Sequence, residues 1–332
     1  MIPLSSDNST PDYPPFDEQR AFRLICTQAS MGPRPPGCGA HRTLIEFIKQ
    51  ELGKYAPDSR TQPFEVILGG EKVPCENVLG LFKSHSPHRK ILIGTHFDTR
   101  LTADNERDAA EQAKPIIGAN DGGSGTAVML ELARLFSLRP PPCDIVLAFF
   151  DAEDVGNIDG NDFYMGSLYF SRHMGDFRPD EVIILDMVGG KCMSLDIDMN
   201  GLYYDQCYNL GWKAMLQKFV IISKTLSYRQ LAAPKKRKFK YIGCDHIPFL
   251  QVLIPAFILI DIDYPQWHTH KDLPEHCSPD SLKAIGHILL EYIYHYPCYE
   301  ELVAEINRKA EQEKAKKDEP PQPAPEGSPV KS

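Results

Sequence analysis

The sequence lacks a long apolar run, a surplus of positive charge and paired cysteines, and each absence excludes a class of protein. No stretch approaches the ~20 apolar residues that a membrane-spanning helix needs, so we expect no membrane span. With 36 Lys and Arg against 45 Asp and Glu, the net charge is −9. This argues against nucleic acid as a partner, because binding to a phosphate backbone needs an excess of cations. The nine cysteines contain no Cys-x-x-Cys pair, so neither a disulfide framework nor a thiolate zinc site is indicated.

The two ends of the chain differ in composition from its middle. The start is rich in Pro, Ser and Asp, and the stretch from about residue 308 onward is charged and Pro-rich, with almost nothing to bury. We therefore expect a flexible segment at residues 1–20, one catalytic domain at 21–300 and a charged tail at 301–332. No basic region followed by an apolar one marks a signal peptide, so a cytoplasmic location is favoured.

Strand and helix patterns alternate between these ends, which is typical of an α/β fold. Residues 41–52 and 126–138 repeat apolar side chains at helical spacing, which predicts two amphipathic helices. Short apolar runs predict strands at residues 66–68, 78–82, 90–95, 144–150, 181–185 and within the run 252–260. The run KILIGT at 90–95 is apolar along most of its length, as expected of a strand that is buried on both faces.

Polar residues follow three of the predicted strands at the point where each strand ends. These residues are His96, the stretch FFDAED up to residue 154, and Asp186. Open α/β sheets bind their ligands at the carboxyl ends of the strands, so we expect one site here. Three further polar motifs are GANDGGSG at 118–125, CDHIPF at 244–249 and WHTHKD at 267–272.

Carboxylates and imidazoles dominate these motifs, and they form the ligand set that binds Zn²⁺ without thiolates. A catalytic zinc keeps three protein ligands and one open position, and Asp121, Asp154 and His268 fit that role. The glycines on both sides of Asp121 permit a tight loop. Several buried carboxylates without a cation would leave like charges unpaired in a small volume. We therefore predict a metal site, against the alternative of a surface cluster of solvated acids.

The motifs also carry a family resemblance. The set GTHFDTR, GANDGGSGTAVMLELARLF, FFDAEDVG, ILDMVGGK, CDHIPFL and WHT resembles the glutaminyl-peptide cyclotransferases (glutaminyl cyclases), notably their bacterial members of the animal-like type. The resemblance spans roughly residues 32–294 and extends to zinc aminopeptidases of the same fold. It implies a single α/β domain with a central mixed, mostly parallel sheet flanked by helices. It also implies an enzyme that converts the N-terminal Gln of peptides or proteins to pyroglutamate with release of ammonia, using one zinc.

The resemblance implies a role for each site residue. The zinc ligands of the family correspond here to Asp121, Asp154 and His268. Its general acid/base corresponds to Glu153, its proton-network carboxylates to Asp186 and Asp245, and its substrate-packing Trp to Trp267. Three features differ from the family: Asp154 stands where Glu is frequent, Cys244 stands where Asp is frequent, and the second Trp of the animal enzymes is missing.

Two other interpretations remain open for the whole protein. His96 and Asp186 also match the second-metal ligands of two-zinc aminopeptidases, so a hydrolase that removes N-terminal residues is the alternative. A metal-free binding module on the same fold is the third, and it has no use for Glu153. At single positions, Trp267 could belong to the core, Asp245 could only cap a helix, and the run KKRKFK at 235–240 could be a solvated loop.

Overall fold

The computed structural model describes residues 13–85, 89–228, 239–295, 303–304 and 307–308. Its centre is a six-stranded sheet in the order β1-β2-β4-β3-β5-β8. The strands are β1 (Arg60–Leu68), β2 (Glu71–Phe82), β3 (Lys90–His96), β4 (Asp144–Phe150), β5 (Glu181–Asp186) and β8 (Ala256–Ile260). Strands β1 and β2 pair in antiparallel fashion, as do β2 and β4, whereas β4, β3, β5 and β8 run parallel. The mixed, mostly parallel sheet that we expected is confirmed.

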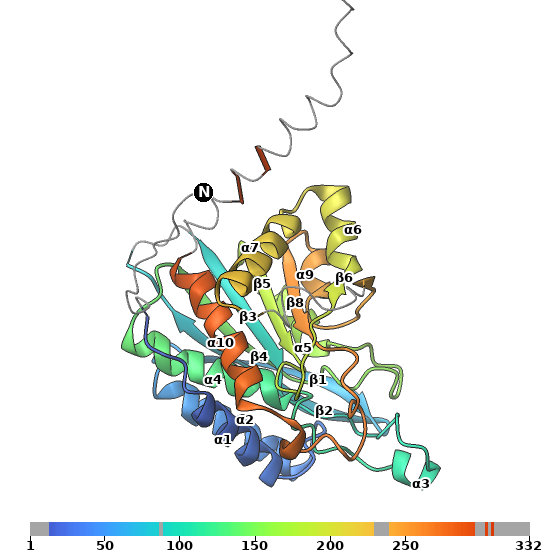
Figure 1. Ribbon diagram of the computed structural model, residues 1–332. Helices are drawn as coiled ribbons and strands as arrows, with labels where there is room; N and C mark the ends of the chain where they lie inside the picture. The colour runs from blue at the N-terminus through green and yellow to red at the C-terminus, as the bar shows by residue number, and fades with distance from the viewer. Residues whose placement is uncertain (1–12, 86–88, 229–238, 296–302, 305–306, 309–332) are drawn as a thin grey trace, which may run out of the picture.

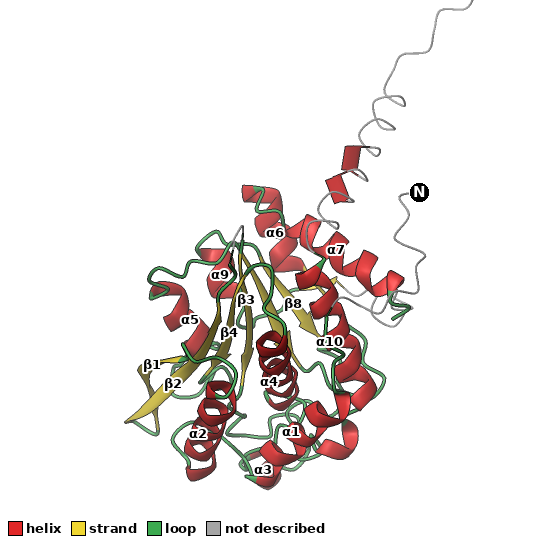
Figure 2. Cartoon of the chain, turned by 90° about the vertical axis from the view of Figure 1, so that its left-hand side faces the viewer, coloured by secondary structure: helices red, strands yellow, loops and turns green. Residues whose placement is uncertain are grey.

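Helices cover both faces of this sheet (Figures 1 and 2). One face carries α1 (Glu18–Ser30), α2 (Gly39–Gly53), α4 (Gly123–Leu138), α7 (Trp212–Thr225) and α10 (Pro279–Tyr294). The other face carries α5 (Met165–Arg172) and α9 (Ile247–Gln251), and α6 (Met199–Tyr208) contacts both α7 and α9. The short elements are α3 (Ala109–Gln112), the 3-10 turn η1 (Pro274–His276), and the paired strands β6 (Ile197–Asp198) and β7 (Phe239–Lys240).

The strands contribute to two hydrophobic cores, one on each face of the sheet. Successive residues of a strand point to opposite faces. In β3, Ile91 and Ile93 pack into the core under α4 and α10, whereas Leu92 packs with Phe170 of α5 and Phe249 of α9. Burial on both faces explains why these strands appear in the sequence as continuous apolar runs rather than alternating ones.

The predicted elements are present, with differences at their ends. Helix α4 begins at Gly123, before the predicted start at residue 126, because Gly122 has a φ of 75° and turns the chain into the helix. Of the apolar run 252–260, only the part in β8 is a strand, and the residues before it follow the short helix α9. The helix predicted at residues 41–52 matches α2 closely.

The N-terminal segment that we expected to be flexible is partly packed. Tyr13 stacks on Tyr294 with ring centroids 5.6 Å apart and donates a hydrogen bond to Glu291. Phe16 is buried, and α1 begins at Glu18. Residues 1–12, most of the predicted C-terminal tail and residues 235–238 of the basic run lie outside the described residues, so those predictions stay predictions. Among the helices of the described residues, none is long and apolar enough to cross a membrane.

Candidate active site

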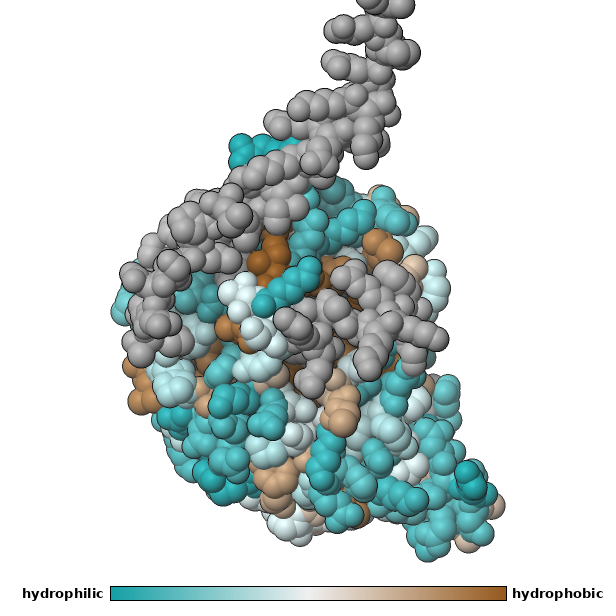
Figure 3. Space-filling view, in the orientation of Figure 1, coloured by the Kyte–Doolittle hydropathy of each residue, from teal (hydrophilic) through white to brown (hydrophobic). Residues whose placement is uncertain are grey.

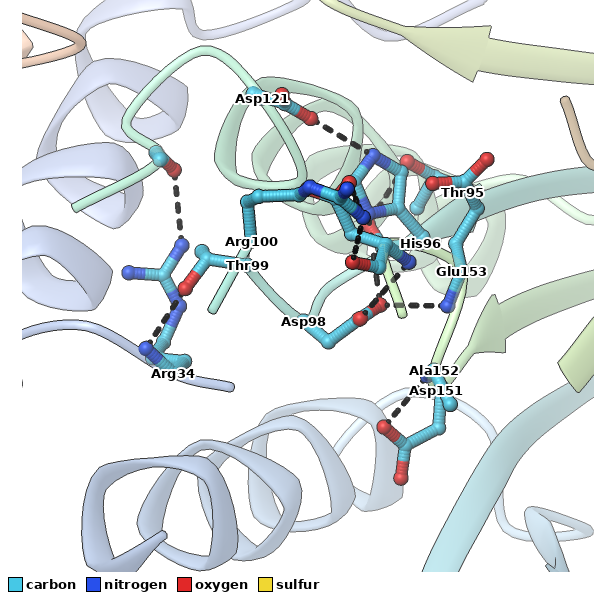
Figure 4. Close-up of polar contacts among 12 residues, drawn as sticks. Arg34, Thr95, His96, Asp98, Thr99, Arg100, Asp121, Asp151, Ala152 and Glu153 are labelled. Atoms are coloured by element: carbon cyan, nitrogen blue, oxygen red, sulfur yellow. Dashed lines mark hydrogen bonds and ion pairs between the residues drawn. The ribbon is translucent and has the colours of Figure 1, made fainter. Parts of the chain in front are cut away.

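The site lies where the carboxyl ends of three neighbouring strands meet (Figure 4). His96 ends β3, Glu153 and Asp154 follow β4, and Asp186 ends β5. Because β4, β3 and β5 are adjacent and parallel, these side chains reach one edge of the sheet. The convergence that we predicted from the strand ends is therefore present.

Three of the predicted ligands come together in a first group. Asp121, Asp154 and His268 are all buried, and each offers a ligand atom within 4.8 Å of the others. His268 Nε2 lies 3.3 Å from Asp154 Oδ1 and 3.5 Å from Asp121 Oδ2. Within the described part of the chain, Oδ2 of both aspartates is buried without a hydrogen-bond donor. Two carboxylates and an imidazole with unused lone pairs are a donor set that fits Zn²⁺.

A second group overlaps the first. His96 Nε2 lies 3.1 Å from Asp121 Oδ1 and 3.4 Å from Asp186 Oδ1, and these three side chains also lie close enough to hold an ion. Figure 4 shows Asp121 pointing toward the His96 ring. Asp121 is thus common to both groups, as a bridging carboxylate would be in a two-metal site.

The loop of Asp121 is held by buried side chains from distant segments. Asp272 accepts hydrogen bonds from the backbone N–H groups of Asn120 (2.9 Å) and Asp121 (3.0 Å). Behind the loop, the fully buried Arg34 donates to the carbonyls of Ile117 and Gly118 at 2.7 and 2.9 Å. Burial lowers the pKa of Arg34 to about 10, so it stays charged at neutral pH. It therefore places a positive charge behind the acidic cluster.

A second buried aspartate holds the loop after β4 in the same way. Asp98 accepts from the N–H groups of Glu153 (3.0 Å) and Asp154 (3.1 Å) (Figure 4). Ala152, just before them, has a φ of 56°, a left-handed conformation that costs a non-glycine residue about 1–3 kcal/mol. Asp151 accepts from the Ala152 N–H and pairs with His41 Nε2 at 2.7 Å. These bonds hold the strained loop that presents Glu153.

The sequence analysis did not identify the residues that hold the two loops in place. It also left open the roles of Asp245 and Trp267, and the structure places both. Asp98 and Asp272 belong to the motifs THFDTR and WHTHKD, so the signal was the motif itself. Asp245 does not cap α9, because the capping position is His246 and no side chain caps the helix. Trp267 is half-buried and lies in the wall of a pocket rather than in a core interior.

Buried carboxyl groups dominate the electrostatics of the site. Its five carboxyl groups are all buried, and they belong to Asp121, Glu153, Asp154, Asp186 and Asp245. Burial raises the pKa of Glu153 well above its usual range, and burial raises that of Asp245 to about 7. Burial lowers the pKa of His268, but Asp154 and Asp121 outweigh this and raise it to about 9. A bound divalent cation would favour the ionised carboxylates that burial disfavours.

A pocket opens on this cluster and encloses about 340 Å³ of empty space, its open mouth included. Asp121, Glu153, Asp154, Asp186 and His268 line its polar side. The remaining wall is formed mainly by apolar and aromatic side chains, which are Phe163, Met187, Ile260, Ile262 and Trp267. Behind Asp186, the buried Cys244 thiol donates to Asp186 Oδ2 at 3.3 Å. The arrangement can bind a small group with an apolar stem and a polar end beside a metal.

Comparisons with known proteins support both enzyme interpretations. The glutaminyl cyclase of Bacteroides thetaiotaomicron bound to N-acetylhistamine is 29% identical, with a TM-score of 0.75 over 85% of this chain and 99% of that chain. The glutaminyl cyclase of Tannerella forsythia is 30% identical, with a TM-score of 0.73 over the same shares. A leucine aminopeptidase precursor from Bacteroides thetaiotaomicron is 29% identical, with a TM-score of 0.76 over 85% and 98%.

Curated relatives fall into the same two groups. The glutaminyl-peptide cyclotransferase of Drosophila melanogaster is 24% identical over 79% of this chain and 77% of its own length. Aminopeptidase YwaD of Bacillus subtilis is 29% identical, and the match spans 53% of this chain but only 37% of that protein. A probable zinc metalloprotease of Leptosphaeria maculans is 31% identical over 40% of this chain and 31% of its own length. The chain thus spans about a third of the length of these last two relatives.

The model of peptidase family M28 matches residues 77–293, which is well over half of the chain and includes both ligand groups and the residues that line the pocket. The solved structures of glutaminyl cyclases and of the aminopeptidase precursor are matched over nearly their full length. The chain therefore belongs to peptidase family M28, and it is similar to glutaminyl cyclases and to aminopeptidases.

Proposed function

We propose that the protein is a zinc-dependent glutaminyl-peptide cyclotransferase, acting on peptides or proteins that begin with Gln. The observation that carries the proposal is Asp245. It is fully buried next to the site, its pKa is raised to about 7 by burial, and it belongs to neither ligand group within the described residues. The two ligand groups leave this acid without a role, whereas in the proposed cyclase it would hold a proton near Asp186.

In the proposed reaction, the free α-amine of the substrate attacks its own side-chain amide carbonyl. A carbon–nitrogen bond closes the five-membered lactam, the bond to the amide nitrogen breaks, and ammonia leaves, so no water is consumed. The pocket contributes by folding the Gln side chain so that amine and carbonyl meet, an effect that can be worth several kcal/mol. Trp267 and Ile262 in the pocket wall would pack on the stem of that side chain.

Glu153 is the group that we propose moves the proton. Its raised pKa suits a carboxylate that takes a proton from the amine and returns it to the leaving ammonia near neutral pH. Asp186 and Asp245 would share a further proton and stabilise the tetrahedral intermediate. Asp121, Asp154 and His268 would hold one zinc, which when bound polarises the amide carbonyl as a Lewis acid.

The experiment is incubation of the purified protein with a Gln-initiated peptide and a Leu-initiated peptide, followed by mass measurement. We expect the Gln peptide to lose one ammonia and to keep all its residues, and the Leu peptide to stay intact. A Gln peptide in which the α-amine is acetylated is the matched control, because it lacks the nucleophile. Release of free leucine in proportion to enzyme, together with an unchanged Gln peptide, would overturn the proposal.

The second candidate is a two-zinc aminopeptidase. The observation that favours it is the second ligand group, because His96, Asp121 and Asp186 lie within reach of one ion. It predicts two zinc ions per chain and a free amino acid as product. The ratio of zinc to protein and the product of the Leu peptide therefore separate the two candidates.

A further inference from the structure

A segment beside the pocket, at residues 104–106, contacts the loop that carries both His268 and Trp267. The N–H of Asn105 donates to the carbonyl of His268 at 3.1 Å, and Asn105 Nδ2 donates to the carbonyl of Trp267 at 3.0 Å. Glu106 accepts from the N–H of His270 at 3.0 Å. Two consecutive residues thus bind three residues of the ligand loop.

Asp104 in this segment faces the side of the His268 ring that points away from the other ligands. Its Oδ2 lies 3.6 Å from His268 Nδ1, an ion-pair distance, while His268 Nε2 faces Asp121 and Asp154. Arg100 and Thr102 fix Asp104 by donating to its two oxygens, at 2.7 and 2.6 Å. A carboxylate on the outer nitrogen sets the tautomer and orientation of a metal-binding imidazole.

Arg100 connects Asp104 to the loop that carries the predicted ligand Asp154. It also donates to the carbonyls of Asp154 and Gly156 at 2.9 and 2.8 Å, and its guanidinium lies 5.4 Å from the centre of the Phe163 ring in the pocket wall. His268 needs such support because its φ is 52°, a left-handed conformation that other contacts must impose. The segment lies next to α3, where Figure 3 shows a mostly hydrophilic surface.

We propose that residues 104–106 form a clasp with two separable tasks, in which Asp104 orients the imidazole of His268 and the Asn105 side chain positions Trp267. The proposal rests on the metal role proposed for His268. Both are positioning residues, since neither lines the pocket. The two tasks predict different kinetic effects, because one side chain acts on a metal ligand and the other acts on the pocket wall.

The test compares Asp104→Asn, Asn105→Ala and the control Asp108→Asn. Asp108 lies two residues beyond this segment and caps α3 through the N–H groups of Ala110 and Glu111. Zinc affinity is measured by competition with a chelator. Asp104→Asn should lower it about 10–100-fold, the usual effect of removing an outer partner of a ligand, whereas Asn105→Ala and Asp108→Asn should leave it unchanged.

Asn105→Ala should instead raise KM for the Gln peptide while leaving kcat and zinc content near those of the parent. Trp267 and the buried Trp212 are the two tryptophans of the chain, so quenching of tryptophan fluorescence by acrylamide should also increase in this variant. An unchanged zinc affinity in Asp104→Asn, or an equal loss of affinity in Asn105→Ala, would overturn the clasp. Zinc affinity and fluorescence need no turnover, so they test the clasp even where the peptide assay refutes the cyclase.

Discussion

Replacing Glu153 by Gln tests the proposed proton-transfer group with a small change in shape. The backbone of Glu153 is held independently of its side chain, because its N–H donates to Asp98 and its carbonyl accepts from the N–H of Tyr164 at 2.9 Å. The substitution removes a carboxyl group that can carry a negative charge within an acidic cluster. Burial raises the pKa of Glu153 most, and the neighbouring Asp154, Asp245 and Asp186 raise it further. We therefore expect the variant to fold and to be at least as stable as the parent.

We expect the substitution to lower the turnover number, kcat. General acid/base catalysis by one side chain contributes about 10²- to 10⁴-fold, which corresponds to about 3–5 kcal/mol of barrier. An amide cannot take the proton from the attacking amine, so kcat should fall by that factor. Zinc content should stay that of the parent, because Glu153 belongs to neither ligand group within the described residues.

The assay is release of ammonia from a Gln-initiated peptide, with zinc measured on the same samples. Asp154→Asn serves as the comparison, because it changes the neighbouring residue and should remove the ion. If Glu153→Gln loses zinc as Asp154→Asn does, Glu153 is a ligand and the assignment is wrong. If kcat falls less than tenfold, another group moves the proton.

Three further variants test the metal site and the electrostatics. His268→Ala should lose zinc and activity together after dialysis against a chelator, and full activity there would exclude His268 from the site. His96→Ala should keep the parent's ratio of one zinc per chain by metal analysis, and a fall from two to one would favour the aminopeptidase. Asp261 has its pKa raised by burial to about 6, against about 3.9 unfolded. Its ionisation therefore reduces stability as pH rises through about 4–6. Asp261→Asn should be more stable than the parent at pH 7, by up to about 3 kcal/mol, but not at pH 4. Urea unfolding at both values checks this, and an equal difference at the two would contradict it.

The central sheet is predictable from the sequence because its strands are buried on both faces. Apolar runs such as those in β3 and β4 have no polar alternation that would obscure their limits. Helix α10 is also marked in the sequence, by the helical spacing of the buried Leu282, Ile285 and Leu289, but our sequence analysis does not identify it. Helix α6 is harder to predict from the sequence, because its aromatic side chains Tyr203 and Tyr208 are exposed and do not form an apolar face that packs into the core.

The ligand residues are predictable because their motifs follow strand ends, but their neighbours are not. Asp98 lies in the same motif as His96, and Asp272 lies in the same motif as His268. Both are aspartates, like the predicted ligands Asp121 and Asp154, so residue type does not distinguish them from ligands. Only the geometry separates them, since each accepts two consecutive backbone N–H groups. Asp104 is similar: its partner His268 is distant in sequence, and no local pattern marks the pair.

The number of ions depends on Asp186 more than on any predicted ligand. Asp121 is common to both groups, so a second ion needs Asp186 Oδ1 as well as His96. Asp186 Oδ2 already accepts the Cys244 thiol, and burial keeps the pKa of that thiol well above its usual range. Asp245 adds a carboxyl that itself holds a proton up to about pH 7. The protonated thiol of Cys244 favours an Asp186 that accepts a hydrogen bond over one that binds metal, which is the physical reason to expect a single zinc in the proposed site.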